Sequence, residues 1–149
     1  MKRILIDCDP GHDDMMAIML ACASAEIAVA GVTTVAGNQT GEKTYRNALR
    51  TLTLIGRADI PVARGADKPL LRPLTVAPEI HGVTGLDGAD LPEPGFPGAS
   101  ESAASFIVRT LMGSRDPLTL VPTGPLTNVA LALLEEPRLA GKLERIVLM

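Results

Sequence analysis

The sequence has few cysteines, no concentrated positive charge and no long hydrophobic run. Its two cysteines, Cys8 and Cys22, lie in apolar surroundings without a CxxC spacing. This argues against a disulfide framework and against a thiolate metal site, and it favours a reducing cytoplasm. The 14 Lys and Arg residues are scattered through a chain of formal net charge −3 and pI of about 5.3. We therefore expect no nucleic-acid partner.

The hydrophobic runs are short. The longest, residues 15–23, cannot cross a bilayer, and the run that follows Met1-Lys2-Arg3 stops at Asp7, well short of a signal peptide core. We expect no membrane partner. A chain of 149 residues with 46% apolar content is sufficient for one domain with a buried core.

Negative charge, by contrast, is concentrated in one segment. Asp7, Asp9, Asp13 and Asp14 lie within eight residues that contain no Lys or Arg, directly after the apolar run Ile4–Ile6. At about 4 Å, each like-charge pair costs roughly 1 kcal/mol in water and several times more when partly buried. Either some carboxyls carry protons or a metal ion lies among them, and hard oxygens favour Ca²⁺ or Mg²⁺ over Zn²⁺. We favour the metal over a solvated acidic turn.

Strand-like and helix-like segments alternate along the chain. The pattern predicts strands at residues 4–6, 28–35, 61–63, 118–121 and 146–149, and helices at residues 13–23, 41–55, 102–112 and 125–134. The helix at 13–23 is apolar almost all round, so we expect it to be deeply buried. The alternation indicates an α/β fold with a mainly parallel, Rossmann-like open sheet flanked by helices. We see no linker that would divide residues 1–149.

A long stretch rich in Pro and Gly, residues 64–99, shows no sustained periodicity. Connections of this length in compact domains are usually functional lids or disordered. Its segment Ile80–Gly88 contains His81 and three glycines, which are typical of a mobile flap.

Polar side chains follow three of the predicted strands. Asp9 follows the first strand, Asn38 the second and Thr123 the fourth. Because ligands bind outside the carboxyl ends of open parallel sheets, we expect these residues to converge at one edge. Asp13 and Asp14 project from the first helical turn about 100° apart and can serve different partners.

Four sequence blocks, in order, resemble the inosine-uridine nucleoside N-ribohydrolase family. They are Asp7–Asp14 (DCDPGHDD), Val35–Thr40 (VAGNQT), Ile80–Gly82 (IHG) and Leu120–Asn128 (LVPTGPLTN). The resemblance implies the nucleoside hydrolase fold and Ca²⁺-dependent hydrolysis of the N-glycosidic bond of ribonucleosides such as uridine, cytidine or inosine. It also implies a role in nucleoside salvage and a homodimer or homotetramer.

The resemblance implies roles for individual residues as well. Asp9, Asp14 and the backbone carbonyl of Thr123 would hold Ca²⁺, and Asp9 would also act as general base on a metal-bound water. Asp13 and Asn38 would hydrogen-bond ribose hydroxyls. The chemistry is coherent, because a metal lowers the pKa of bound water and a nearby carboxylate can accept its proton.

The other candidates have simpler expected roles. Asp7 is expected to support the turn behind the metal ligands. His81 is either a contact to the nucleobase, as the resemblance implies, or a surface histidine. His12 is expected to begin a helix and to be hydrogen-bonded locally, whereas Gly124 and Asn128 are expected to serve turn geometry and helix capping. His12 and the stretch Thr84–Gly88 resemble members that act on pyrimidine ribosides.

Members of this family are about twice as long, and their second half supplies another Asp to the metal, an Asn to the sugar and often a His to the leaving base. We therefore expect residues 1–149 to be the N-terminal part of a single nucleoside hydrolase domain that is inactive by itself. Two alternatives stay open. One is a Mg²⁺-dependent phosphohydrolase of the haloacid dehalogenase type, whose motif wants Thr or Val where Gly11 stands. The other is a non-catalytic remnant that binds nucleosides or oligomerises.

Overall fold

A five-stranded parallel sheet forms the centre of the protein. The computed structural model describes residues 1–88 and 90–149. The strands are β1 (Lys2–Cys8), β2 (Ile27–Thr34), β3 (Val62–Arg64), β4 (Leu118–Pro122) and β5 (Leu143–Ile146). Their order in the sheet is β3-β2-β1-β4-β5, and each neighbouring pair is parallel. This confirms the predicted α/β fold with a parallel open sheet.

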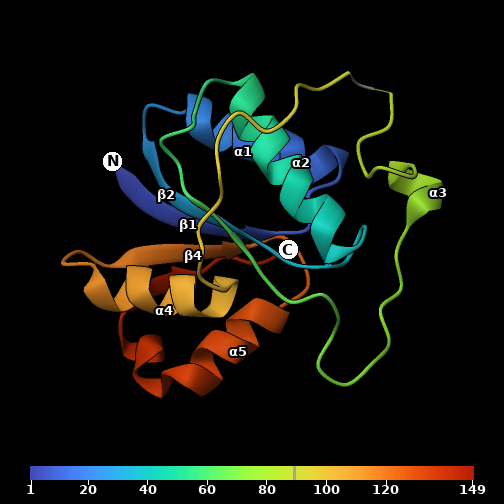
Figure 1. Ribbon diagram of the computed structural model, residues 1–149. Coiled ribbons are helices and arrows are strands. Elements are labelled where there is room, and N and C mark those ends of the chain that lie inside the picture. Colours follow the sequence, from blue (N-terminus) through green and yellow to red (C-terminus); the bar gives the residue numbers. More distant parts are fainter. Residues whose placement is uncertain (89) are drawn as a thin grey trace.

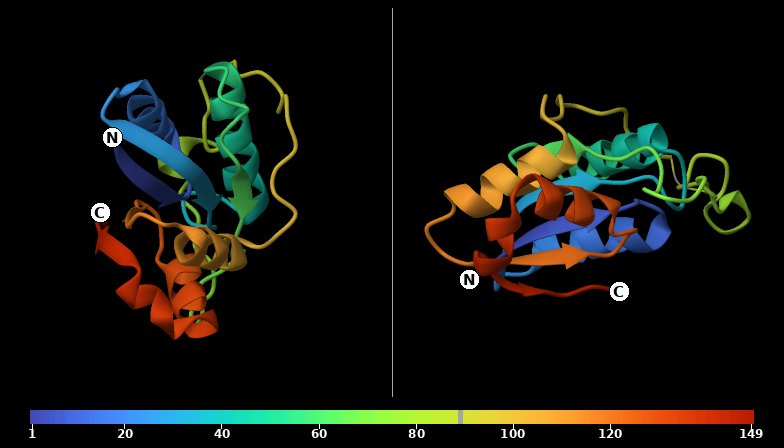
Figure 2. Two further views of the ribbon diagram at one scale, coloured as in Figure 1. Left: turned by 90° about the vertical axis from the view of Figure 1, so that its left-hand side faces the viewer. Right: turned by 90° about the horizontal axis from the view of Figure 1, so that it is seen from below.

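Helices cover both faces of the sheet (Figures 1 and 2). Helices α1 (His12–Ala23) and α2 (Gly41–Leu54) lie on one face, and α4 (Ala103–Gly113), α5 (Thr127–Glu135) and the 3₁₀ helix η1 (Pro137–Gly141) lie on the other. The short helix α3 (Pro78–His81) projects beside the sheet in the long connection between β3 and α4. None of the helices in the described residues is long and apolar enough to cross a membrane.

The central strand β1 explains why the core has two halves. Ile4 and Ile6 point into the cluster beneath α1 and α2, whereas Leu5 points into the cluster beneath α4 and α5. Successive side chains of a strand alternate between faces, so an uninterrupted apolar strand must be covered on both. The three residues are at most 8% exposed. The prediction of a strand buried on both faces is confirmed.

The chain changes winding direction between β1 and β4. From β1 the sheet grows through β2 to β3 on one side, and the chain then returns to add β4 and β5 on the other side. Asp7 near the end of β1 is aligned with Pro122 at the end of β4, and Cys8 with Thr34 of β2. Such a switch point is where open α/β sheets place their ligands, at the carboxyl ends of the strands.

The prediction for the last strand was wrong in its bounds. The apolar residues 146–149 were expected to form it, but β5 comprises Leu143–Ile146. Beyond Ile146 the chain still follows β4, since the N–H groups of Val147 and Met149 donate to the carbonyls of Leu120 (2.9 Å) and Pro122 (3.2 Å). Pairing with β4, rather than hydrophobicity alone, sets where this strand begins.

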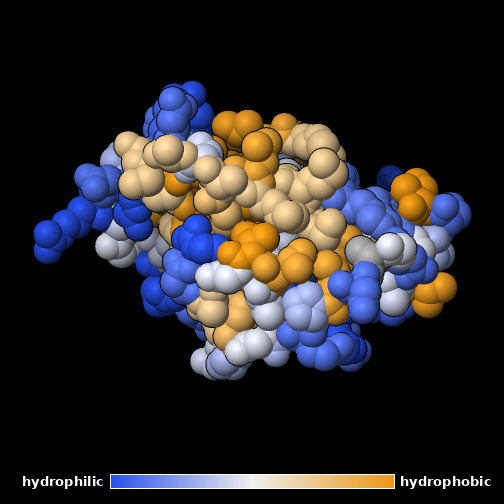
Figure 3. Space-filling view, turned by 90° about the horizontal axis from the view of Figure 1, so that it is seen from above, coloured by the Kyte–Doolittle hydropathy of each residue, from blue (hydrophilic) through white to orange (hydrophobic). Residues whose placement is uncertain are grey.

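The expected deep burial of α1 was also wrong. Within this helix only Asp14, Ile18 and Ala21 are buried, whereas Met16 is 67% and Leu20 74% exposed. A helix that covers one face of a sheet buries one stripe, whatever the composition of its other side. Apolar residues accordingly gather on the surface above α1 and α2 (Figure 3).

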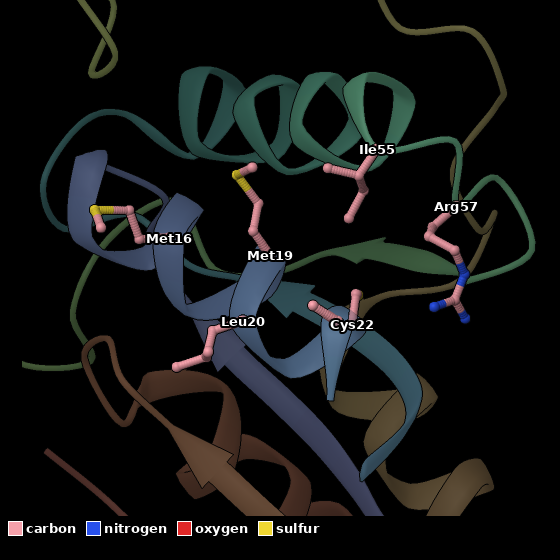
Figure 4. A pocket seen from close by; sticks show the side chains of 7 residues that line it. Met16, Met19, Leu20, Cys22, Ile55 and Arg57 are labelled. Carbon is pink, nitrogen blue, oxygen red and sulfur yellow. The ribbon is translucent and has the colours of Figure 1, made fainter. Parts of the chain in front are cut away.

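Part of this apolar surface is hollowed between α1 and the end of α2. The cavity measures about 520 Å³ and is lined mainly by Met16, Met19, Leu20, Cys22 and Ile55 (Figure 4). Its lining residues among those described include no carboxylate and none from the acidic turn after β1. It is therefore separate from the site predicted from the sequence.

Candidate active site

The acidic turn folds into a tight link between β1 and α1. Asp9 follows the end of β1 and is 6% exposed, and Asp14, in the first turn of α1, is 3% exposed. The Asp9 N–H donates to Oδ2 of Asp14 at 2.9 Å. Asp13, by contrast, faces outward and is exposed. The two neighbouring aspartates therefore have different environments, as expected from their position on the first helical turn.

The turn after β2 is bound to Asp9. The Asn38 N–H donates to Asp9 Oδ2 at 2.6 Å, and the Asn38 side chain donates from Nδ2 to the Asp9 carbonyl at 3.1 Å. A carboxylate that accepts a backbone N–H is fixed in orientation. The predicted convergence of Asp9 and Asn38 is confirmed.

The end of β4 completes the site from the other side. The Thr123 N–H donates to the Asp7 carbonyl at 2.8 Å, which sets Thr123 beside the acidic turn. Thr123, Asp9, Asp13 and Asn38 share the lining of a cavity of about 390 Å³. Sequence reasoning missed Met149, which lines the same cavity.

Two glycines let the neighbouring turns approach the Asp9 carboxylate. A Cβ atom at Gly124 would lie 2.6 Å from Asp9 Oδ1, and one at Gly37 would overlap Oδ2. Both turns therefore require glycine where they pass the carboxylate. The turn role expected for Gly124 is confirmed in this sense. The need for Gly37 was missed, although its place in the turn beside Asn38 was a usable signal.

Burial of these carboxyls shifts their ionisation. Desolvation raises the pKa of Asp9 to about 7, against the lowering effect of the Asn38 N–H, and the negative charge of Asp14 adds to the rise. Burial likewise raises the pKa of Asp14 and brings that of Asp7 to about 6. Gathering these groups therefore destabilises their charged forms, as the sequence indicated.

The available donor set fits a hard divalent cation. Asp9 and Asp14 offer adjacent carboxylate oxygens, and the Thr123 carbonyl accepts no hydrogen bond from the described residues. The Thr123 side chain lies beside Asp14, and its hydrogen bond lowers the pKa of that carboxyl against the effect of burial. The described residues include no group of three His, Cys, Asp or Glu side chains that could hold a metal ion. A cation here would therefore need further oxygens, because Ca²⁺ takes six to eight.

Asp7 lies beneath the candidate site and is hydrogen-bonded to three parts of the chain. It is fully buried, and its Oδ1 accepts hydrogen bonds from Thr33 Oγ1 at 2.6 Å and Asn128 Nδ2 at 2.8 Å. Its backbone carbonyl holds Thr123. Asp7 thus ties β2, α5 and the turn after β4 to the end of β1.

The expected capping role of Asn128 was wrong. The N-cap of α5 is Leu126, and Asn128 is 1% exposed inside the helix. Besides Asp7, its Nδ2 reaches the Thr34 carbonyl at 2.9 Å, and its Oδ1 accepts the Ala66 N–H at 2.9 Å. Asn128 therefore joins the ends of β1, β2 and β3. The partners lie up to 121 residues away, so sequence proximity gave no signal.

His81 is half-buried and contacts the acidic turn, so it is not a free surface histidine. Its ring stacks on that of His12 with centroids 5.8 Å apart. The expected local hydrogen bond of His12 was wrong, because Nε2 bonds the carbonyl of Asp87, 75 residues away, at 2.9 Å.

The flap that carries His81 is folded onto α2. Gly82, Gly85 and Gly88 have positive φ angles of 78°, 89° and 94°, a conformation that favours glycine. Side chains of Gln39 and Lys43 donate to the carbonyls of Gly82 and Val83 at 2.9 and 2.6 Å, and Asn47 donates to that of Thr84 at 3.0 Å. Closure of the flap over a substrate stays a prediction.

The fold and the cavity together define a doubly wound α/β protein with a carboxylate-rich site at its switch point. The sequence profile of the family described as inosine-uridine preferring nucleoside hydrolase matches residues 4–149. The chain belongs to this family.

Several nucleoside hydrolases are similar to the chain over almost its whole length. Two proteins named pyrimidine-specific ribonucleoside hydrolase RihA, from Photobacterium profundum and Escherichia coli O9:H4, are each 56% identical over 99% and 98% of this chain, which correspond to 48% and 47% of their own lengths. The purine-preferring ribonucleoside hydrolase from Gardnerella vaginalis superposes with a TM-score of 0.93 at 34% identity, over 99% of this chain and 48% of that one. An inosine-guanosine nucleoside hydrolase gives 0.90 at 36% identity, again over 99% and 48%. The chain spans about half the length of these relatives.

Replacing Asn128 by Ala should destabilise the protein by about 3 kcal/mol, because it removes a hydrogen bond from each of three groups, the Asp7 carboxylate, the Thr34 carbonyl and the partly buried Ala66 N–H. Urea denaturation of the full-length protein would measure this. The matched control is Glu135→Ala on the exposed side of the same helix, which should change the free energy of unfolding by less than about 0.5 kcal/mol. Equal effects of the two substitutions would remove Asn128 from the support of the site.

Stability should depend on pH in opposite directions with and without a divalent cation. The raised pKa of Asp9 stabilises the folded metal-free protein below its unfolded value near 3.8, and this contribution is lost as pH rises through about 7. In chelator, the thermal midpoint should therefore fall between pH 4 and pH 8. Saturating Ca²⁺ should restore it at the high end, where the carboxylates are ionised. Asp9→Asn should flatten the chelator profile, and a profile indifferent to both Ca²⁺ and this substitution would contradict the assignment.

Proposed function

We propose that the full-length protein hydrolyses the N-glycosidic bond of ribonucleosides to free base and ribose. The observation that carries this proposal is the burial of Asp9 against Asp14, at a cavity that Asp9 borders together with Asn38 and Thr123. The names of the relatives support it, since each is a nucleoside or ribonucleoside hydrolase.

We propose Ca²⁺ as the cofactor, held by the carboxylates of Asp9 and Asp14 and the carbonyl of Thr123. When bound, the ion supplies Lewis acidity that lowers the pKa of water. Asp9 accepts the proton of the attacking water. The Asn38 N–H on Oδ2 and the close passage of Gly124 at Oδ1 hold this carboxylate in place for the transfer.

Binding of the sugar falls to Asp13 and Asn38, which share the cavity wall with Asp9. Hydrogen bonds to ribose hydroxyls would fix the anomeric carbon beside the water that Asp9 deprotonates. In glycoside hydrolysis this carbon becomes oxocarbenium-like, so contacts that strengthen as charge develops lower the barrier. Asp13 is well suited, because its carboxylate is exposed at the cavity rather than committed to the turn.

For the base we propose a pyrimidine, as in uridine and cytidine, with inosine as the alternative. The 56% identical relatives are named pyrimidine-specific, whereas the purine-preferring and inosine-guanosine hydrolases are 34% and 36% identical. His81 in the flap is the proposed contact to the base. Homo-oligomerisation, a cytoplasmic location and a role in nucleoside salvage stay predictions.

The full-length protein should release ribose and free base from uridine in buffer without phosphate, because water is the nucleophile. Asp9→Asn should keep the fold and lower kcat by about 10²- to 10⁴-fold, since it removes the proton acceptor. Chromatography of the products, with circular dichroism of the variant, would measure both. Ribose 1-phosphate as the product would show phosphorolysis and overturn the mechanism.

Residues 1–149 expressed alone should not turn over nucleosides. They offer Ca²⁺ only three proposed ligands, Asp9, Asp14 and Thr123, whereas the ion takes six to eight oxygens. An assay of this segment with uridine, inosine and Ca²⁺, beside the full-length protein, tests this. Turnover within about tenfold of the full-length protein would show that the first half holds a complete site, since loss of general acid catalysis alone costs about 10²-fold or more.

A further inference from the structure

Two imidazole rings lie face to face where the acidic turn meets the flap. His12 is the first residue of α1 and His81 is the last residue of α3. Their ring centroids are 5.8 Å apart and their planes differ by 21°, which is a stacked arrangement. Stacked aromatic rings attract each other beyond the effect of the area that they bury. The contact therefore restrains the flap relative to α1.

Packing, rather than hydrogen bonding, fixes the ring of His81. Its Nδ1 is buried and has no hydrogen-bond partner among the described residues. The ring lies directly on the backbone of Gly11, where an added Cβ would overlap Nδ1 and lie 2.7 Å from Cε1. Two adjacent residues, Gly11 and His12, therefore hold the ring next to the turn that carries Asp9.

His12 also holds the flap through a hydrogen bond. Its Nε2 lies 2.9 Å from the carbonyl oxygen of Asp87. A carbonyl oxygen can only accept, so Nε2 carries the hydrogen in this contact. The Asp87 carboxylate in turn accepts the N–H groups of Val83 and Thr84 at 2.8 and 2.9 Å. One side chain thus reaches both the ring of His81 and the residue that organises the flap turn.

We propose that His12 is a positioning residue, which orients His81 toward the base and holds the flap turn over the site. The proposal rests on the proposed function, in which His81 contacts the base. Gln39 and two side chains of α2, Lys43 and Asn47, fasten one side of the flap through the carbonyls of residues 82–84. His12 fastens the flap from α1 through Asp87. Among the described residues, no other side chain of α1 is hydrogen-bonded to the flap, so loss of His12 would free the flap from α1.

Two substitutions separate the two contacts of His12. His12→Phe keeps a ring to stack on His81 but removes the donor to Asp87. His12→Gln keeps a donor near the position of Nε2 but removes the stack. His12→Ala removes both contacts. Glu79→Ala is the matched control, because Glu79 is in the same helix as His81 and its side chain is exposed.

In the full-length protein, His12→Ala should raise KM for uridine about tenfold or more, with a smaller change in kcat, because displaced positioning groups can cost up to about 10²-fold. Amide hydrogen exchange of residues 82–87 should rise in the same variant. His12→Gln should restore most of the exchange protection, His12→Phe should restore most of KM, and Glu79→Ala should change neither. All variants should keep the thermal midpoint of the wild type within a few degrees.

A double-substitution cycle gives the decisive comparison. If His12 acts through His81, then His12→Ala added to His81→Ala should have no further effect on KM. Additive effects on KM, or unchanged exchange in His12→Ala, would overturn the proposal. If His12→Ala does not fold, the Phe and Gln variants carry the test, and identical behaviour of these two would overturn it. A wild type inactive on uridine, cytidine and inosine would reject the proposed function. The exchange measurements need no turnover, so they would then decide the positioning role by themselves.

Discussion

The structure depends on the burial of Asp7, Asp9 and Asp14 together at the carboxyl end of β1. Three desolvated carboxyls in one place are unfavourable, as the raised pKa values of all three show. The surrounding chain compensates by placing N–H, hydroxyl and amide donors on individual oxygens. These donors do not neutralise all of the negative charge, and a cation would balance the remainder.

This constraint explains why residues from distant parts of the chain meet here. β1 lies between β2 and β4, so the turns that follow all three strands reach Asp9. One turn contributes the Asn38 N–H and another the backbone of Thr123 and Gly124, while Asn128 ties the strand ends together from the opposite face. A change in strand order would separate these groups even if every residue were kept. The geometry of the site therefore depends on the order of the strands in the sheet.

Local patterns predicted most of the fold, and long-range pairing explains what they missed. The apolar run before Asp7 and the repeated alternation of strands and helices were sufficient for the sheet and its flanking helices. The outward side of α1, with Met16 and Leu20, carries the same residue types as its buried side, so composition could not separate them. The convergence of Asp9, Asn38 and Thr123 followed from the strand ends. The partnerships of Asn128 with Asp7 and of His12 with Asp87 did not, because they join residues 121 and 75 positions apart without a local signal.

The most direct test of the central claim is anomalous diffraction from crystals of the full-length protein grown with Ca²⁺ and, separately, with Mn²⁺. The account predicts one strong peak at about 2.3–2.6 Å from the carboxylate oxygens of Asp9 and Asp14 and from the Thr123 carbonyl when Ca²⁺ is bound. Crystals of Asp14→Ala grown in the same way should lack the peak. An ordered acidic turn without a peak in the wild-type crystals, or a peak held by other residues, would contradict the account.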